Sequence, residues 1–147
     1  MKYFSIKELT NSETAKRRGI PNVPSVNEIK HLTELIENIL DPLREAWGSP
    51  IKITSGYRGL ALNKAVGGST TSAHNAGYAA DMVPANGKIT EFKKFVMDWL
   101  KKNDIKFDQY INEFSGVSQW VHIAIKNRNG DQRKQYLLYK NGKYTKI

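Results

Sequence analysis

The sequence predicts an α+β fold in which N-terminal helices pack on a small antiparallel sheet. Apolar residues recur at spacings of three and four between positions 27 and 47, which is the pattern of an amphipathic helix. From position 107 onward, short alternating runs are separated by turns rich in Asn, Asp and Gly. Because helical segments come mainly first and strand segments mainly last, we expect the strands to pair with one another.

Length and composition narrow the class of protein. The 147 residues, 39% of them hydrophobic, suffice for one domain with its own core, so we expect a single domain over residues 1–147, acting as a monomer. No apolar run approaches the roughly 18 residues of a membrane-spanning helix. The N-terminus carries Lys2 and Glu8 and lacks an apolar segment, so no secretory signal is expected. Because the chain has no cysteine, every metal ligand must be nitrogen or oxygen.

The first long helix is expected between Asn27 and Trp47. Its apolar residues form one stripe, made of Ile29, Leu32, Leu35, Ile36, Ile39, Leu40, Leu43 and Trp47. Pro42 is expected either to kink this helix or to restart it with Asp41 as the cap. His31 lies roughly opposite the stripe, so we expect it to be a solvated histidine without a functional role.

A short strand and a second helix are expected before the strand-rich half of the chain. Ile51–Thr54 alternates as a strand does, and Thr90–Lys102 is amphipathic, with Thr90 as its expected N-cap. Four further strands are expected, over Phe107–Asn112, Trp120–Lys126, Tyr136–Lys140 and Lys143–Ile147. The Asn141-Gly142 dipeptide between the last two strands favours a two-residue hairpin turn.

His122 is the most informative single position in the predicted strands. Val121, Ile123 and Ile125 alternate to the apolar face, whereas Trp120, His122 and Ala124 alternate to the other face. The imidazole of His122 is therefore expected to point away from the main core. A lone histidine is more often a half-buried residue bonded to a neighbour, so this position needs partners before it indicates a site.

His74 and Asp81 are the expected partners of His122. They lie seven positions apart in a segment rich in Gly and Ala, which allow the backbone to approach a metal closely. Two neutral imidazoles and one carboxylate can hold Zn²⁺ and leave one coordination position open, although such a set also accepts other divalent ions. Taken alone, the pair could equally be a glycine-rich surface loop with an incidental histidine.

Four motifs together carry a family resemblance: Ser-Gly-Tyr-Arg at 55–58, Val-Gly-Gly-Ser at 66–69, Ser-x-His-x-x-Gly-x-Ala-x-Asp at 72–81 and Trp-Val-His at 120–122. They resemble the M15 family of zinc peptidases, which includes D-alanyl-D-alanine carboxypeptidases and phage endolysins that cut the peptide stems of peptidoglycan. Segments 3–9, 22–24 and 39–44 are also similar to short M15A-type members, so the resemblance covers almost the whole chain. It implies helices packed on an antiparallel sheet, with zinc at its face.

The resemblance also implies roles for individual residues. His74, Asp81 and His122 would be the zinc ligands. Arg58 would hold a substrate carboxylate or carbonyl, which suits a planar guanidinium, and Ser72 would add a hydrogen bond to the substrate. The alternative for Arg58 is a salt bridge that anchors its loop.

The general base is expected to be Glu113. Many family members have a glutamate three residues before the last histidine ligand, but this chain has Gln119 there, which cannot accept a proton. Short M15A-type relatives resemble this sequence in having a glutamate at the position of Glu113. Strand alternation places Glu113 on one face with Phe107, Gln109 and Ile111, opposite Asp108, for which a structural role is expected.

These expectations describe a zinc-dependent hydrolase of peptidoglycan stem peptides. The net charge of +9 would draw it to an anionic cell wall, although a basic surface also serves solubility. Without a signal peptide, it would be made in the cytoplasm and reach the wall after release, as a phage lysin does, or be carried by a virion. Whether it is an endopeptidase or a carboxypeptidase is open at this point.

Two other functions would each fit part of the sequence. The Gln119 substitution would suit a catalytically silent, zinc-holding module that binds the cell wall. The charge alone would suit a nucleic-acid binder, but Tyr57, Tyr78 and Trp120 belong to the metal motifs and are not interleaved with basic residues, so no nucleic-acid partner is expected.

Overall fold

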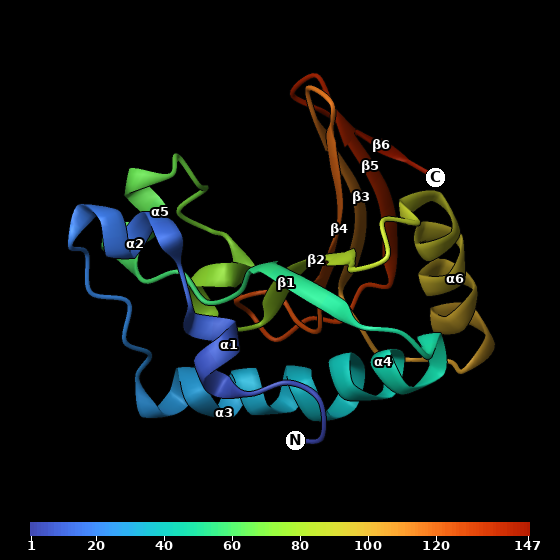
Figure 1. Cartoon of the computed structure of the whole chain (residues 1–147), viewed down its shortest axis with the longest axis horizontal. Helices are drawn as coiled ribbons and strands as arrows, with labels where there is room; N and C mark the ends of the chain where they lie inside the picture. The colour runs from blue at the N-terminus through green and yellow to red at the C-terminus, as the bar shows by residue number, and fades with distance from the viewer.

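The computed structural model describes residues 1–147 and has an α+β fold. A six-stranded sheet has the order β1-β2-β4-β3-β5-β6 (Figure 1). The elements in chain order are α1 (Ile6–Thr10), α2 (Glu13–Arg18), α3 (Val26–Leu35), the π-helical turn η1 (Ile36–Leu40), α4 (Asp41–Trp47), β1 (Ile51–Ser55), α5 (Leu60–Ala65), the 3-10 turn η2 (Ala73–Ala76), β2 (Ala79–Pro84), α6 (Ile89–Lys102), β3 (Gln109–Ser115), β4 (Ser118–Ala124), β5 (Gln135–Lys140) and β6 (Lys143–Lys146). None of the helices combines the length and the apolar character that crossing a membrane requires.

The long N-terminal helix continues through Pro42 without restarting. Ser25 and Glu28 form a capping box at its start, and the π-helical turn η1 separates α3 from α4. Pro42 lies in the first turn of α4, where its missing N–H removes a helical hydrogen bond, and a π turn just before it adjusts the helix to that loss. The proline is therefore accommodated by a π turn, and the helix does not restart at Asp41.

Asp41 has a different role from the predicted cap. Its carboxylate is buried and accepts the backbone N–H groups of Lys2, Tyr3 and Phe4 at 2.6, 3.0 and 3.1 Å. The prediction of Asp41 as a cap is wrong because the helix is already formed before it. Its carboxylate instead anchors the N-terminal segment against α4.

The sheet is antiparallel except between β3 and β5, which run parallel. After β4, residues 125–134 return the chain to the start of β3, where Lys134 N–H donates to Phe107 O at 3.1 Å and Gln135 N–H donates to Asp108 O at 2.9 Å. The β5–β6 hairpin turns at Asn141 and Gly142, whose φ angles are 54° and 72°. These positive angles confirm the predicted two-residue turn.

The two faces of the sheet differ in character. Val121 and Ile123 of β4 are fully buried on one face, in the core that α3, α4 and α6 contribute to. Phe107 also lies in this core, before β3 begins, so the prediction that it shares a face with Glu113 is wrong. Alternation is regular only from Gln109 onward, where the ladder to β4 starts. The opposite face, which carries His122, is left for the site.

Helix α6 begins one residue earlier than predicted. It starts at Ile89, and no side chain caps it, so the prediction of Thr90 as N-cap is wrong. Asn86 Oδ1 instead accepts the backbone N–H of Lys88 at 3.0 Å, which stabilises the turn that leads into the helix.

Candidate metal centre

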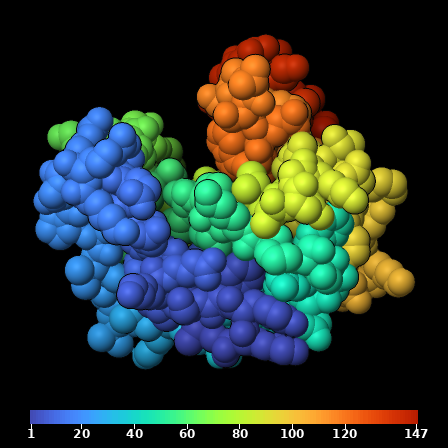
Figure 2. All heavy atoms as spheres, viewed as in Figure 1, coloured from blue at the N-terminus to red at the C-terminus, as the bar shows by residue number.

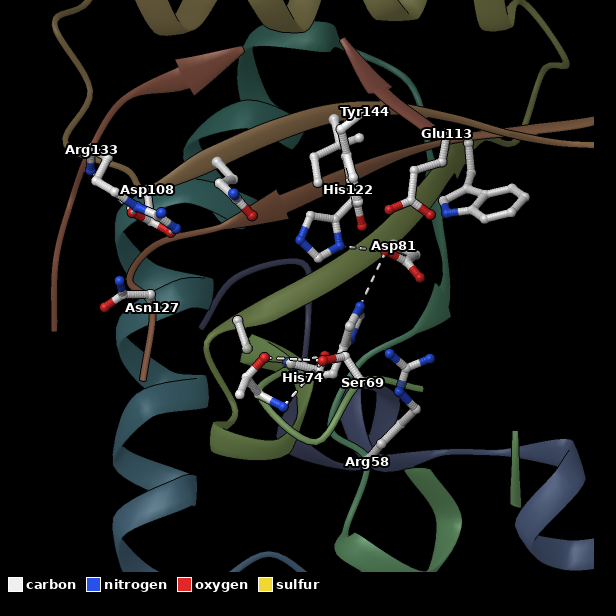
Figure 3. Close-up of a pocket in the computed structure, with 16 residues that line it drawn as sticks. Arg58, Ser69, His74, Asp81, Asp108, Glu113, His122, Asn127, Arg133 and Tyr144 are labelled. Carbon is white, nitrogen blue, oxygen red and sulfur yellow. Dashed lines mark hydrogen bonds and ion pairs between the residues drawn. The ribbon is translucent and has the colours of Figure 1, made fainter. Parts of the chain in front are cut away.

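Three side chains from three elements converge in the hollow face of the sheet. His74 comes from η2, Asp81 from the middle of β2, and His122 from β4. Asp81 and His122 are direct partners across the β2–β4 ladder. One potential ligand atom from each residue lies within 4.8 Å of the others, and all three residues are buried (Figure 3).

The two imidazoles are aimed at one carboxylate oxygen. His74 Nδ1 lies 2.7 Å from the carbonyl oxygen of Gly56, which can only accept, so Nδ1 carries the proton and Nε2 is left as a free ligand atom. That Nε2 lies 3.3 Å from Asp81 Oδ1, and His122 Nδ1 lies 2.9 Å from the same oxygen. The orientation of His74 is therefore set by the backbone before any ion binds.

Gly56 makes this arrangement possible. A side chain at this position would collide with the backbone carbonyl of Leu9, and the next residue, Tyr57, donates its N–H to that carbonyl at 2.7 Å. The N-terminal helix α1 is therefore packed directly behind the loop that orients His74. Only glycine allows the two backbone segments to approach so closely.

Electrostatics favour a cation at this point. Burial lowers the pKa of His74, which keeps its imidazole neutral. Burial alone would raise the pKa of Asp81, but the charges and hydrogen bonds of His74 and His122 outweigh it, so the pKa of Asp81 lies well below its usual range. For His122, burial acts to lower the pKa, but the hydrogen bond to Asp81 and the charge of Asp81 outweigh burial, so the pKa of His122 is raised. A buried carboxylate with two imidazole nitrogens around it is a nitrogen and oxygen donor set that fits Zn²⁺.

The three residues lie in the wall of an open cavity of about 390 Å³. The predicted substrate and base residues line the same cavity: Arg58, Ser72 and Glu113. On the surface, the molecule is hollowed between the blue and green N-terminal segments and the orange and red β3–β6 region (Figure 2). The six predicted residues therefore come together although their sequence positions span 58 to 122.

Arg58 is available to a ligand. It forms none of the salt bridges of this protein, so the alternative of a loop-anchoring ion pair is wrong. Its Nε is buried and has no hydrogen-bond partner. Burial lowers its pKa, although the charges of Asp81 and Glu113 oppose this. A half-buried guanidinium with a free donor is suited to binding a carboxylate or a carbonyl.

Ser72 already has one structural contact. Its Oγ accepts the backbone N–H of His74 at 3.1 Å and so caps η2. Because a hydroxyl accepts and donates at the same time, its proton is still available within the cavity.

Glu113 lies on the metal face of β3. Ile111 pairs with His122 and Glu113 pairs with Trp120, so Glu113 is a diagonal neighbour of His122, with Cα atoms about 7–8 Å apart. Burial raises the pKa of Glu113, and the charge of Asp81 adds to the shift. A carboxylate with a raised pKa beside a metal site is suited to accepting a proton.

Gln119 lies on the other side of the sheet. It pairs with Phe114 and lies an odd number of positions from His122, so the two side chains point to opposite faces of the sheet. Its Oε1 accepts a hydrogen bond from Lys93 Nζ of α6 at 2.6 Å. A carboxylate at position 119 of this strand would therefore face α6 and not the metal site. Having glutamine instead of glutamate at position 119 therefore does not remove a carboxylate from the cavity.

A comparison with known families identifies the family of the chain. The family model described as Peptidase M15 matches residues 2–124. The chain belongs to the peptidase M15 family. No curated protein matches the sequence. Membership indicates that the chain is a peptidase, and the matched residues of this M15 peptidase include all six residues that were predicted for the site.

Other parts of the M15 peptidase cavity were not predicted. Ser69, Thr71, Asn127, Arg133 and Tyr144 also line it. Arg133 is held by Asp108, which is buried and accepts its Nε and Nη2 at 2.8 Å each. Tyr144 comes from β6. The predicted turn at Asn141-Gly142 pairs Tyr144 with Tyr139, and strand alternation would then have placed both side chains on one face.

His31 differs from its prediction. Its Nδ1 lies 2.7 Å from Ala76 O, and its ring stacks on Tyr78 with centroids 4.0 Å apart. The prediction of a solvated histidine is wrong because the polar side of α3 packs against the loop that follows η2. In the M15 peptidase, His31 supports the segment between His74 and Asp81 from outside the cavity.

Proposed function

We propose that this M15 peptidase is a zinc-dependent hydrolase of amide bonds in peptidoglycan stem peptides. The observation that supports it most is the convergence of His74, Asp81 and His122 in one open cavity with Arg58 and Glu113. A donor set of two imidazoles and one carboxylate is typical of catalytic zinc sites, which keep a coordination position open.

Each residue has a part in the proposed hydrolysis. His74, Asp81 and His122 would hold the zinc ion, which supplies Lewis-acid chemistry when bound. Glu113 accepts a proton from the attacking water and delivers it to the leaving amine. Arg58 binds a carboxylate or carbonyl of the substrate and so fixes the amide in the cavity, and Ser72 adds a hydrogen bond.

The proposed setting is the bacterial cell wall. A net charge of +9 favours approach to an anionic polymer. We propose that the protein acts there as a monomer after release from the cytoplasm, as a phage-type lysin or a virion-borne peptidase. No nucleic-acid partner is part of this proposal.

Digestion of purified peptidoglycan, followed by mass spectrometry of the released fragments, tests the function and names the bond. We expect the zinc-loaded protein to release peptide fragments. Glu113→Gln should lower kcat by about 10²–10⁴-fold, because it removes the proton acceptor, while leaving the zinc content unchanged. Glu91→Gln, at an exposed position of α6, is the matched control and should retain activity.

Two results would contradict the proposal in different ways. No fragments from walls of several chemotypes would exclude hydrolysis, and wall binding without hydrolysis would favour the silent module. Full activity in Glu113→Gln would leave the function standing and remove Glu113 from the role of base.

A further inference from the structure

A row of side chains crosses the sheet beside the metal ligands, and three of its four members line the cavity: Trp120, Glu113 and Tyr144. Trp120 of β4 pairs with Glu113 of β3, Glu113 pairs with Tyr139 of β5, and Tyr139 pairs with Tyr144 of β6. Direct partners in a sheet point to the same face, so all four side chains lie on the face that carries His122. Asp81 and His122 form a neighbouring row on the same face, because they are also direct partners. The two rows are two residues apart along each strand, as Trp120 and His122 are in β4.

The row ends in two neighbouring tyrosines, of which Tyr139 is half-buried and Tyr144 is exposed. Their ring centroids are 4.6 Å apart with an interplanar angle of 50°. Tyr144 is 58% exposed, yet it lines the same cavity as Glu113 and Trp120 (Figure 3). Burial and the charge of Glu113 both raise the pKa of Tyr144, which is consistent with their proximity. Tyr144 therefore presents its ring to whatever occupies the part of the cavity beside Glu113.

The two tyrosines lie outside the part of the chain that the family model matches. That match ends at residue 124, at the end of β4, whereas Tyr139 and Tyr144 belong to the β5–β6 hairpin. The hairpin contributes none of the candidate metal ligands. Through Tyr144 the hairpin therefore adds to the wall of the cavity without supplying a metal ligand. Such a position suits a surface that selects substrates.

We propose that Tyr139 and Tyr144 form a saccharide-binding subsite, which holds a sugar ring of the glycan strand while the attached stem peptide lies at the metal site. This inference rests on the proposed function. The exposed ring of Tyr144, packed on Tyr139, offers an apolar face to the C–H groups of a pyranose, and its hydroxyl offers a hydrogen bond to the polar edge of the sugar.

The spacing of the row fits this occupant. Neighbouring strands lie about 4.8 Å apart, so Tyr144, two strands beyond Glu113, lies on the order of 10 Å from it. An extended peptide covers that distance in about three residues. The sugar-linked end of a stem peptide can therefore reach the tyrosines while an amide near that end lies beside Glu113. Two rings are too small a surface for a stable protein partner.

The first experiment measures sugar binding without hydrolysis. Chitotriose, an oligomer of N-acetylglucosamine, is titrated into the isotope-labelled protein, and amide chemical shifts are followed. We expect shifts in residues 137–146 that are lost in Tyr144→Ala and kept in Tyr144→Phe, because phenylalanine preserves the aromatic face. Tyr3→Ala, which removes a tyrosine that contacts α4, is the matched control and should leave the shifts unchanged.

The second experiment separates the subsite from the peptidase activity. Tyr144→Ala should raise KM about tenfold for a sugar-linked stem peptide, with kcat unchanged, and should leave KM for the same peptide without sugar unaltered. Equal effects on both substrates, or chitotriose shifts that survive Tyr144→Ala, would overturn the subsite while the proposed function stands. Sugar binding at Tyr144 without cleavage of either substrate would sustain the subsite and refute the proposed function.

Discussion

At the scale of single residues, the site depends on hydrogen bonds that fix each ligand before a metal binds. The Gly56 carbonyl holds one nitrogen of His74, and Asp81 Oδ1 is shared by both imidazoles. The contact with Gly56 lies outside the set of candidate ligands, and contacts of this kind fix the ring orientation and the tautomer of a metal-binding histidine. The ligands are therefore preorganised, and each is expected to contribute strongly to zinc affinity.

The prediction at this scale concerns Asp81. Asp81→Asn should lower zinc affinity by more than about 100-fold, because the neutral amide removes the only anionic ligand. Mutating a residue that merely contacts a ligand typically lowers metal affinity by about 10–100-fold, and losing a ligand itself should cost more. Competition with a chromogenic chelator measures the affinity. Asp98→Asn is the control, since it makes the same change at an exposed position of α6, where Asp98 pairs with Lys94. Comparable zinc affinity in Asp81→Asn and Asp98→Asn would contradict the assignment.

At the scale of elements, the N-terminal segment is attached to the helix by one side chain. Three backbone N–H groups, those of Lys2, Tyr3 and Phe4, converge on the carboxylate of Asp41. Phe4 is buried in the core, and the following helix α1 packs behind the loop that contains Gly56. The contact at Asp41 therefore supports the metal site from a distance.

We expect Asp41→Ala to destabilise the protein by about 3 kcal/mol, because three donors lose a charged acceptor in a poorly hydrated position. Urea unfolding followed by circular dichroism measures the loss. Glu45→Ala provides the comparison: it removes an exposed ion pair with Lys2, and such pairs contribute little. If both variants unfolded at the same urea concentration, the anchoring role of Asp41 would be wrong.

At the scale of the whole molecule, charge and shape act together. The net charge is +9, while the site lies in a hollow between the N-terminal segments and the β3–β6 region (Figure 2). In the proposed function, long-range attraction would bring the protein to an anionic polymer, whereas contacts inside the cavity would select the bond. The two contributions differ in how they respond to salt.

Raising the salt concentration should therefore slow hydrolysis of intact cell walls far more than hydrolysis of a short soluble peptide. The Debye length falls from about 10 Å at 0.1 M to about 3 Å at 1 M, which screens attraction to the wall but changes little inside the cavity. Rates on both substrates across this range test the expectation. Parallel losses on the two substrates would show that charge does not guide the protein to the wall.

The sequence allowed the prediction of features that depend on local periodicity. Alternation placed His122 off the core, the apolar stripe predicted the long helix, and Asn141-Gly142 predicted the hairpin. Features that depend on distant partners were missed. Asp41 finds its donors 37 to 39 positions away, and His31 finds Ala76 45 positions away.

The same limit applies to the sheet and to the site. The parallel pairing of β5 with β3 follows from the path of residues 125–134, which no local pattern encodes. Tyr144 reaches the cavity only because of that pairing. The predicted metal ligands came together because the motif resemblance carried information about tertiary structure that periodicity does not contain.

The pairing of Asp81 with His122 has a consequence for folding. These partners are 41 positions apart, and the strands that carry them lie in the middle of the sheet, between β1 and β3. Such non-local pairings form late, because the entropy of closing a long loop must be overcome first. No fragment that lacks either strand can assemble the three ligands. During refolding, high-affinity zinc uptake would therefore mark the moment at which the central strands have paired, and the rate of uptake would report on that step.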